Sequence, residues 1–186
     1  LTDKHTLLCD ANGVGYGCGE NLCGELGIGR KSAEPVTTFT KMKYSESKIV
    51  QVSAGKSFGC LINRLGEVYT FGTPERGHLG NGTEGKSLER AGKYTFDCKS
   101  SPEFVEALSG VKIKMIASGR DHTICADEEG KLYVVCSSKI VLNFLAHHIR
   151  PTLEHQQVRV GIQRIRTARY RKQQDSAQSC SRSFLP

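Results

Sequence analysis

The sequence contains no tryptophan, only five prolines among its 186 residues, and no long apolar run. Its longest apolar stretch, Ile140 to Ala146, is interrupted by Asn143, whereas a membrane-spanning helix needs about 20 apolar residues. We therefore expect no association with a membrane. No charged and then apolar leader opens the chain, and Leu1 rather than Met is its first residue, so we expect a piece of a longer protein. A hydrophobic content of 38% argues against a collagen-like or fully disordered polymer.

Acidic residues and glycine are scarce in the last part of the chain. Residues 1–135 hold 17 Lys and Arg and 17 Asp and Glu, whereas residues 136–186 hold 9 basic and 2 acidic residues. Of the 20 glycines, 19 precede residue 136. The net charge of +7 therefore belongs to the second part, and the two parts are expected to be physically different.

The first part repeats itself. A shift of 53 residues aligns the segment from His5 with the segment from Phe58, and a further shift of 64 aligns the latter with residues near His122. The aligned glycines and tyrosines are Gly13, Tyr16, Gly19, Gly55, Gly66, Tyr69, Gly72, Gly119, Gly130 and Tyr133. Glycine that recurs at fixed offsets indicates backbone positions with positive φ or close approach.

Each repeat is expected to be built from short β-strands. In the second repeat, residues 49–53, 58–62 and 67–71 are rich in β-branched and aromatic residues and are separated by glycine turns. Asp10, Asn63 and Asp127 precede these turns and fit turn chemistry. We predict an all-β fold with repeats at 1–47, 48–110 and 111–135, the last one incomplete, followed by a basic tail at 136–186 without repeats.

The repeats resemble those of the RCC1 (regulator of chromosome condensation) family. The resemblance rests on Ser53-Ala-Gly55, Gly66-Glu-Val-Tyr-Thr-Phe-Gly72 and Gly77-His-Leu-Gly80, with matching segments in the other two repeats. It implies a partial β-propeller of about two and a half blades, because a closed ring of seven such repeats needs about 350 residues. The family's tryptophan is replaced in every repeat, and the replacements are Cys18, Phe71 and Val135.

One segment matches a phosphate-binding loop letter for letter. The pattern G-x-x-x-x-G-K-S is met by Gly80, Gly85, Lys86 and Ser87. Such a loop should leave a buried parallel strand and open a helix, but this one follows a segment that belongs to the repeat. We interpret the match as coincidental and expect no nucleotide or other cofactor.

The eight cysteines include no CxxC pair and are expected to be free thiols, with Cys9, Cys60 and Cys125 acting as small apolar residues in strands. The recurring His5 and His122 are expected to have structural roles. No metal site, nucleophile or pair of carboxylates emerges, so we predict that the protein is not an enzyme.

The tail contains two further patterns. Apolar residues between Ile140 and Ile149 lie on one face of a short predicted helix that ends before Pro151. Residues 158–172 carry a basic run that can attract phosphate groups, or that is a solvated or disordered tail without further function.

These observations favour a macromolecular interaction scaffold, located in the cytoplasm or nucleus, that binds other proteins. A second hypothesis, implied by the resemblance alone, is guanine-nucleotide exchange on a Ran-like small GTPase. A third is attachment to chromatin or nucleic acid through residues 158–172. The charged insertion from Thr83 to Gly110 is where a binding function would be placed.

Overall fold

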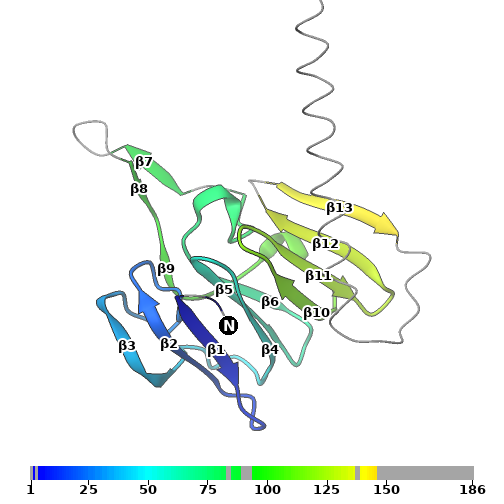
Figure 1. Ribbon diagram of the computed structural model, residues 1–186. Helices are drawn as coiled ribbons and strands as arrows, with labels where there is room; N and C mark the ends of the chain where they lie inside the picture. The colour runs from blue at the N-terminus through cyan, green and yellow to red at the C-terminus, as the bar shows by residue number, and fades with distance from the viewer. Residues whose placement is uncertain (1, 3, 83–84, 89–93, 137–138, 146–186) are drawn as a thin grey trace, which may run out of the picture. The chain divides into compact units, whose positions relative to one another are not determined.

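The computed structural model describes residues 2, 4–82, 85–88, 94–136 and 139–145 (Figure 1). They belong to the unit that runs from Leu1 to His147, and residues 146–186 lie outside the described ranges. The strands are β1 His5–Cys9, β2 Gly15–Asn21, β3 Ser32–Lys41, β4 Ile49–Ala54, β5 Phe58–Asn63, β6 Val68–Gly72, β7 Lys86–Leu88, β8 Tyr94–Phe96, β9 Lys99–Phe104, β10 Ile113–Ser118, β11 Thr123–Asp127, β12 Lys131–Cys136 and β13 Lys139–Leu145.

The strands form three antiparallel sheets, one for each repeat, and a separate hairpin (Figure 1). The sheets have the orders β1-β2-β3, β4-β5-β6-β9 and β10-β11-β12-β13, and the hairpin joins β7 to β8. Two short 3₁₀ turns, η1 Glu75–Gly77 and η3 Glu106–Leu108, are the helical segments within the described ranges, and neither could cross a membrane. The predicted all-β fold is therefore confirmed.

One prediction about the tail is wrong. The apolar residues from Ile140 to Leu145 belong to strand β13, not to a helix, and they pair with β12 in a register that sets Val135 opposite Ile140. Apolar periodicity in a short run does not separate a helix from a strand, and the free edge of β12 decides between them. The remainder of the predicted helix, from residue 146 to Ile149, and the basic run at 158–172 lie outside the described residues.

The hairpin turns in the three repeats share one construction. In the second repeat, the Asn63 side-chain oxygen accepts hydrogen bonds from the amides of Leu65 and Glu67 at 2.9 and 3.0 Å. The side chains of Asp10 and Asp127 each accept two equivalent hydrogen bonds from backbone amides. Every turn then needs one residue in the left-handed region, and the residues that fill this position are Gly13, Gly66 and Gly130, with φ of 81°, 82° and 82°.

Successive repeats dock through the same turn. The carbonyl of Gly13 accepts a hydrogen bond from the Ile49 amide, and the carbonyl of Gly66 accepts one from the Ile113 amide, both at 2.9 Å. A Cβ on Gly13 would lie 2.6 Å from the Cβ of Lys48, so the turn of one repeat lies directly against the first strand of the next. Glycine therefore provides both the backbone conformation and the space for docking.

The apolar cores lie between neighbouring sheets. One core joins the first two sheets, and its buried members are Leu7, Leu26, Met42, Ile49, Leu61, Tyr69 and Phe71. The other joins the second and third sheets, and its buried members are Cys60, Ile62, Val68, Val105, Leu108, Ile113, Ile116, Cys125, Tyr133 and Val135. Each sheet therefore depends on its neighbours for a buried face, as expected for repeats that cannot bury their apolar surface alone.

The residues at the expected tryptophan position pack against glycine in the preceding repeat. A Cβ on Gly27 would meet the Phe71 ring at 3.1 Å, and a Cβ on Gly80 would meet a Val135 methyl at 2.8 Å. Both Phe71 and Val135 are fully buried. Smaller apolar side chains thus fill this position without tryptophan.

Candidate interaction surfaces

The β7–β8 hairpin lies outside the two apolar cores and extends from the sheets (Figure 1). Among the described residues, its two strands pair with each other alone, and Leu88 lies opposite Tyr94 in the register. Leu88 is 67% exposed and Tyr94 is 53% exposed. Large apolar side chains that lie together on one hairpin are typical of a contact site, whereas single ones occur on any surface.

Polar contacts hold the hairpin together. The Lys86 ammonium lies 3.9 Å from the centroid of the Tyr94 ring, and the hydroxyl groups of Ser87 and Thr95 are 3.0 Å apart. At its base, the Asp97 amide donates to the carbonyl of Gly85 at 2.9 Å. The hairpin thus presents an aromatic ring, a side-chain type that is enriched at protein–protein contacts, next to an exposed aliphatic side chain.

The phosphate-loop match falls on this hairpin. Lys86 and Ser87 begin strand β7, so no helix N-terminus is present to bind a phosphate at this point. Gly80 lies against Val135 of the next repeat, which accounts for that glycine by packing.

A second candidate surface is a hollow of about 360 Å³ at one end of the sheets. Its lining comes from all three repeats and consists of Thr2, Lys4, Ala54, Gly55, Lys56, Ser118, Gly119 and Arg120. The Lys56 amide donates to the Arg120 carbonyl at 3.0 Å, so the loops of the second and third repeats are joined at this point. Three cations therefore surround one opening.

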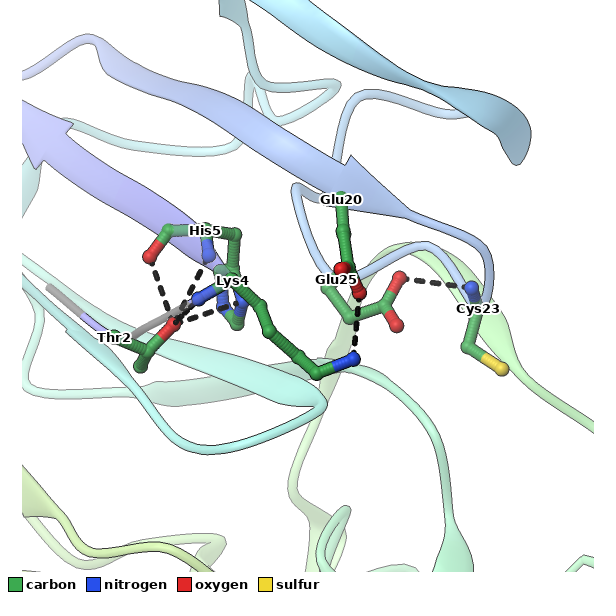
Figure 2. Close-up of polar contacts among 6 residues, drawn as sticks. All are labelled: Thr2, Lys4, His5, Glu20, Cys23 and Glu25. Atoms are coloured by element: carbon green, nitrogen blue, oxygen red, sulfur yellow. Dashed lines mark hydrogen bonds and ion pairs between the residues drawn. The ribbon is translucent and has the colours of Figure 1, made fainter.

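Figure 2 shows polar contacts in the first repeat, including those of Thr2 and Lys4, which line the hollow. Lys4 forms an ion pair with Glu20 at 2.8 Å, which raises the pKa of the lysine. The Thr2 hydroxyl donates to the His5 carbonyl at 2.9 Å and accepts from the His5 amide at 3.1 Å. The Glu25 carboxylate accepts from the Cys23 amide at 2.8 Å, while burial raises the pKa of Glu25.

Nearby carboxylates balance most of the positive charge. Glu20 faces Lys4, and Asp121 lies 3.7 Å from both Arg76 and Arg120. Within the described residues, Lys56 is the lining cation without an ion pair. One uncompensated cation does not define a ligand, so the hollow by itself assigns no chemistry.

His5 and His78 are buried histidines. His78 stacks on Phe58 with ring centroids 4.7 Å apart, and its Nε2 lies 3.9 Å from a carboxylate oxygen of Asp121. Burial lowers the pKa of His78, and burial lowers the pKa of His5 to about 4. Both rings are therefore neutral at pH 7 and pack as parts of the structure. Within the described residues, no group of three or more His, Cys, Asp or Glu side chains could hold a metal ion.

Comparison with known proteins shows what these repeats are. The family model described as the regulator of chromosome condensation (RCC1) repeat matches residues 66–126. The Protein RCC2 homolog of Danio rerio is 32% identical over 142 residues, which cover 70% of this chain and 28% of that protein. Residues 66–126 of this chain therefore carry an RCC1 repeat.

Solved structures share the fold of these RCC1 repeats. Human WBSCR16 matches 76% of this chain with a TM-score of 0.61 and 19% identity, and the match covers 36% of that chain. Prp20p of Saccharomyces cerevisiae, described together with its binding to Gsp1p and histones, matches 79% with a TM-score of 0.62 and 16% identity, covering 38% of its length. The chain therefore spans about 28% of the length of its curated RCC2 relative and little more than a third of these structures.

The outer strands of the RCC1 sheets were missed from the sequence. Strands β3 and β9 contain Pro35 and Pro102, and proline argues against a strand unless the strand lies at an edge. Both strands are the outermost strands of their sheets, where proline is tolerated. The useful signal was the spacing, since residues 30–47 and 83–110 have no other assignment before the following repeat begins.

Proposed function

We propose that this chain is a non-catalytic RCC1-repeat interaction module that binds a partner protein through the β7–β8 hairpin. The observation that carries the proposal is the exposure of Leu88 and Tyr94 on a sheet of only two strands. The RCC1 repeat match and the likeness to RCC2 support a regulatory or interaction role at a coarser level.

The physical argument concerns the stability of the hairpin. A two-stranded sheet is marginally stable in water unless something packs against it. Covering Leu88 and Tyr94 with a partner would remove apolar surface from water, and the Tyr94 hydroxyl could remain at the wet rim of the contact. The insertion in which we expected a binding function, residues 83–110, contains this hairpin.

The test compares two sets of variants in the full chain. Leu88→Ser with Tyr94→Ser should weaken binding of each specific partner about tenfold or more, because a central contact residue contributes roughly 1–2 kcal/mol or more. Leu65→Ser is the matched control, since Leu65 is 62% exposed but lies in the β5–β6 turn. Partners are identified by quantitative affinity purification and their affinities measured with purified proteins. Equal binding by both sets of variants would refute the proposal.

Nucleotide exchange on a Ran-like small GTPase is the second candidate function. The observation that favours it is the structural likeness to Prp20p, which is described as binding Gsp1p and histones. The purified chain would accelerate the release of labelled GDP from Ran-type GTPases, and no acceleration across a panel of small GTPases would eliminate this function.

Attachment to nucleic acid or chromatin through residues 158–172 is a third candidate, and the histone binding of Prp20p is the support for it. A deletion of residues 136–186 is unsuitable as a test, because it would also remove strand β13 from the third sheet. The tail is better altered by changing Arg164, Arg166, Arg169 and Arg171 to Gln in the full chain. Binding to a DNA duplex should then weaken and lose most of its salt dependence; unchanged binding would contradict the hypothesis.

A further inference from the structure

Two cysteines that are far apart in the sequence lie side by side in the structure. Cys23 follows strand β2 in the first repeat, and Cys98 directly precedes strand β9 in the second. Both thiols are free and half-buried. No short cysteine motif connects them in the sequence.

The backbone brings the two segments into contact. Gly24 has a φ of +86°, and a Cβ on it would lie 2.5 Å from the Cα of Ser100 and 2.7 Å from the carbonyl oxygen of Lys99. A hydrogen bond of 2.7 Å from the Gly29 amide to the Ser100 carbonyl holds the same loop against β9. The Cys23 thiol is close enough to the Cys98 thiol for the two side chains to interact.

We propose that Cys23 and Cys98 are a redox-sensitive thiol pair that a peroxide converts into a disulfide between the first and second repeats. In the first step, the sulfur of Cys98 attacks a peroxide oxygen, which leaves a sulfenic acid on Cys98 and releases water. The sulfur of Cys23 then displaces the sulfenic hydroxyl as a second water, and the S–S bond forms. Two thiols are oxidised and one hydrogen peroxide molecule is reduced to two water molecules.

The environment of Cys23 decides the order of these steps. Burial, followed by the interaction with Cys98, raises the pKa of Cys23 to about 12. Cys23 is therefore a protonated thiol at pH 7 and a poor first nucleophile, which leaves the first attack to Cys98. In the second step, the neighbouring sulfenic acid makes Cys23 the resolving cysteine by proximity.

The disulfide would have a structural consequence. Cys98 lies between the base of the β7–β8 hairpin, at Asp97, and the outer strand β9. A bond to Cys23 would fix the base of the hairpin to the β2–β3 loop of the neighbouring repeat. Cross-linking distant positions also restricts the unfolded chain, so the oxidised protein should unfold at higher urea concentration than the reduced protein.

The experiment uses the full chain treated with hydrogen peroxide, alkylated with N-ethylmaleimide and digested without reductant. Mass spectrometry should find a peptide pair joined through Cys23 and Cys98, which dithiothreitol separates. In Cys23→Ser, dimedone should label Cys98 as a sulfenic acid, whereas Cys98→Ser should leave Cys23 as the free thiol. Cys9→Ser is the matched control, because Cys9 is a half-buried thiol that contacts the Val50 carbonyl, and it should leave the cross-link intact.

Three outcomes would overturn the proposal. The first is oxidation of other cysteines while Cys23 and Cys98 remain alkylated by N-ethylmaleimide. The second is pairing of either cysteine with a different partner at equal or greater yield. The third is accumulation of Cys98 sulfinic acid in the wild-type chain without a cross-link, which would show that Cys23 does not resolve the intermediate.

Discussion

The docking of one repeat on the next can be measured with a matched pair of glycine substitutions. Gly13 and Gly130 occupy the same position of the same hairpin turn, and their φ angles are +81° and +82°. They differ in their surroundings. A Cβ on Gly13 would lie 2.6 Å from the Cβ of Lys48 and 3.2 Å from the amide nitrogen of Ile49, whereas no described atom lies within 4 Å of a Cβ on Gly130.

Substitution of either glycine by alanine has the same conformational cost, and only the substitution at Gly13 also creates a clash. An L-residue in the left-handed region costs roughly 1–2 kcal/mol, so Gly130→Ala should lower the free energy of unfolding by about that amount. Gly13→Ala adds overpacking against the backbone of the next repeat, which typically costs roughly 1–3 kcal/mol more. The same clash would disrupt the 2.9 Å hydrogen bond that the Ile49 amide donates to the Gly13 carbonyl.

The assay is urea unfolding monitored by far-UV circular dichroism, since the chain has no tryptophan whose fluorescence could report unfolding. The expected result is a midpoint clearly lower for Gly13→Ala than for Gly130→Ala, with similar slopes. Equal midpoints would refute the reasoning, because they would show that the contact between repeats contributes nothing beyond the conformation of the turn.

Three further predictions concern the buried contacts. Lowering the pH from 6.5 to 4 should reduce the free energy of unfolding of the wild type by about 3 kcal/mol more than that of His5→Phe. The reason is that unfolding returns the pKa of His5 from about 4 to 6.5, so the stability from this histidine is complete above pH 6.5 and is lost as the pH falls. Parallel pH profiles of the two proteins would contradict this prediction. Gln51→Ala should lower the free energy of unfolding by about 1–3 kcal/mol, because the Gln51 side chain accepts a hydrogen bond from the Ile116 amide at 3.0 Å and donates one to the Ile116 carbonyl at 2.9 Å. The control Val50→Ala, at an exposed position, should change it by less than about 0.5 kcal/mol. Similar values for the two variants in urea unfolding would argue against a bridge between repeats. Phe71→Ala should cost roughly 3–5 kcal/mol by leaving a cavity in the first core, and a loss below about 1 kcal/mol in the same assay would show that this core is not tightly packed.

Local patterns in the sequence were sufficient for the inner strands and their turns. The strands predicted at 49–53, 58–62 and 67–71 appear as β4, β5 and β6 within a residue at each end. These segments are rich in β-branched and aromatic residues, and Gly66 in the turn after β5 and Gly72 at the end of β6 have a positive φ that other residues rarely adopt. Such signals are local, and they survive in any tertiary context.

Long-range contacts decided the remaining elements. Residues 139–145 became a strand because β12 offered an edge to pair with, and the proline-containing β3 and β9 became strands because they lie at sheet edges. The hairpin was predicted only as an exposed insertion, and the exposure of Leu88 and Tyr94 depends on the absence of core packing around it.

The sequence by itself determined the repeat, its period and its turns, because glycine at fixed offsets and short apolar strands express backbone geometry directly. Only the tertiary structure decided which side chains meet between repeats. Cys23 and Cys98 become neighbours because the loop that follows β2 lies against β9, and such a contact between distant segments leaves no trace in local composition.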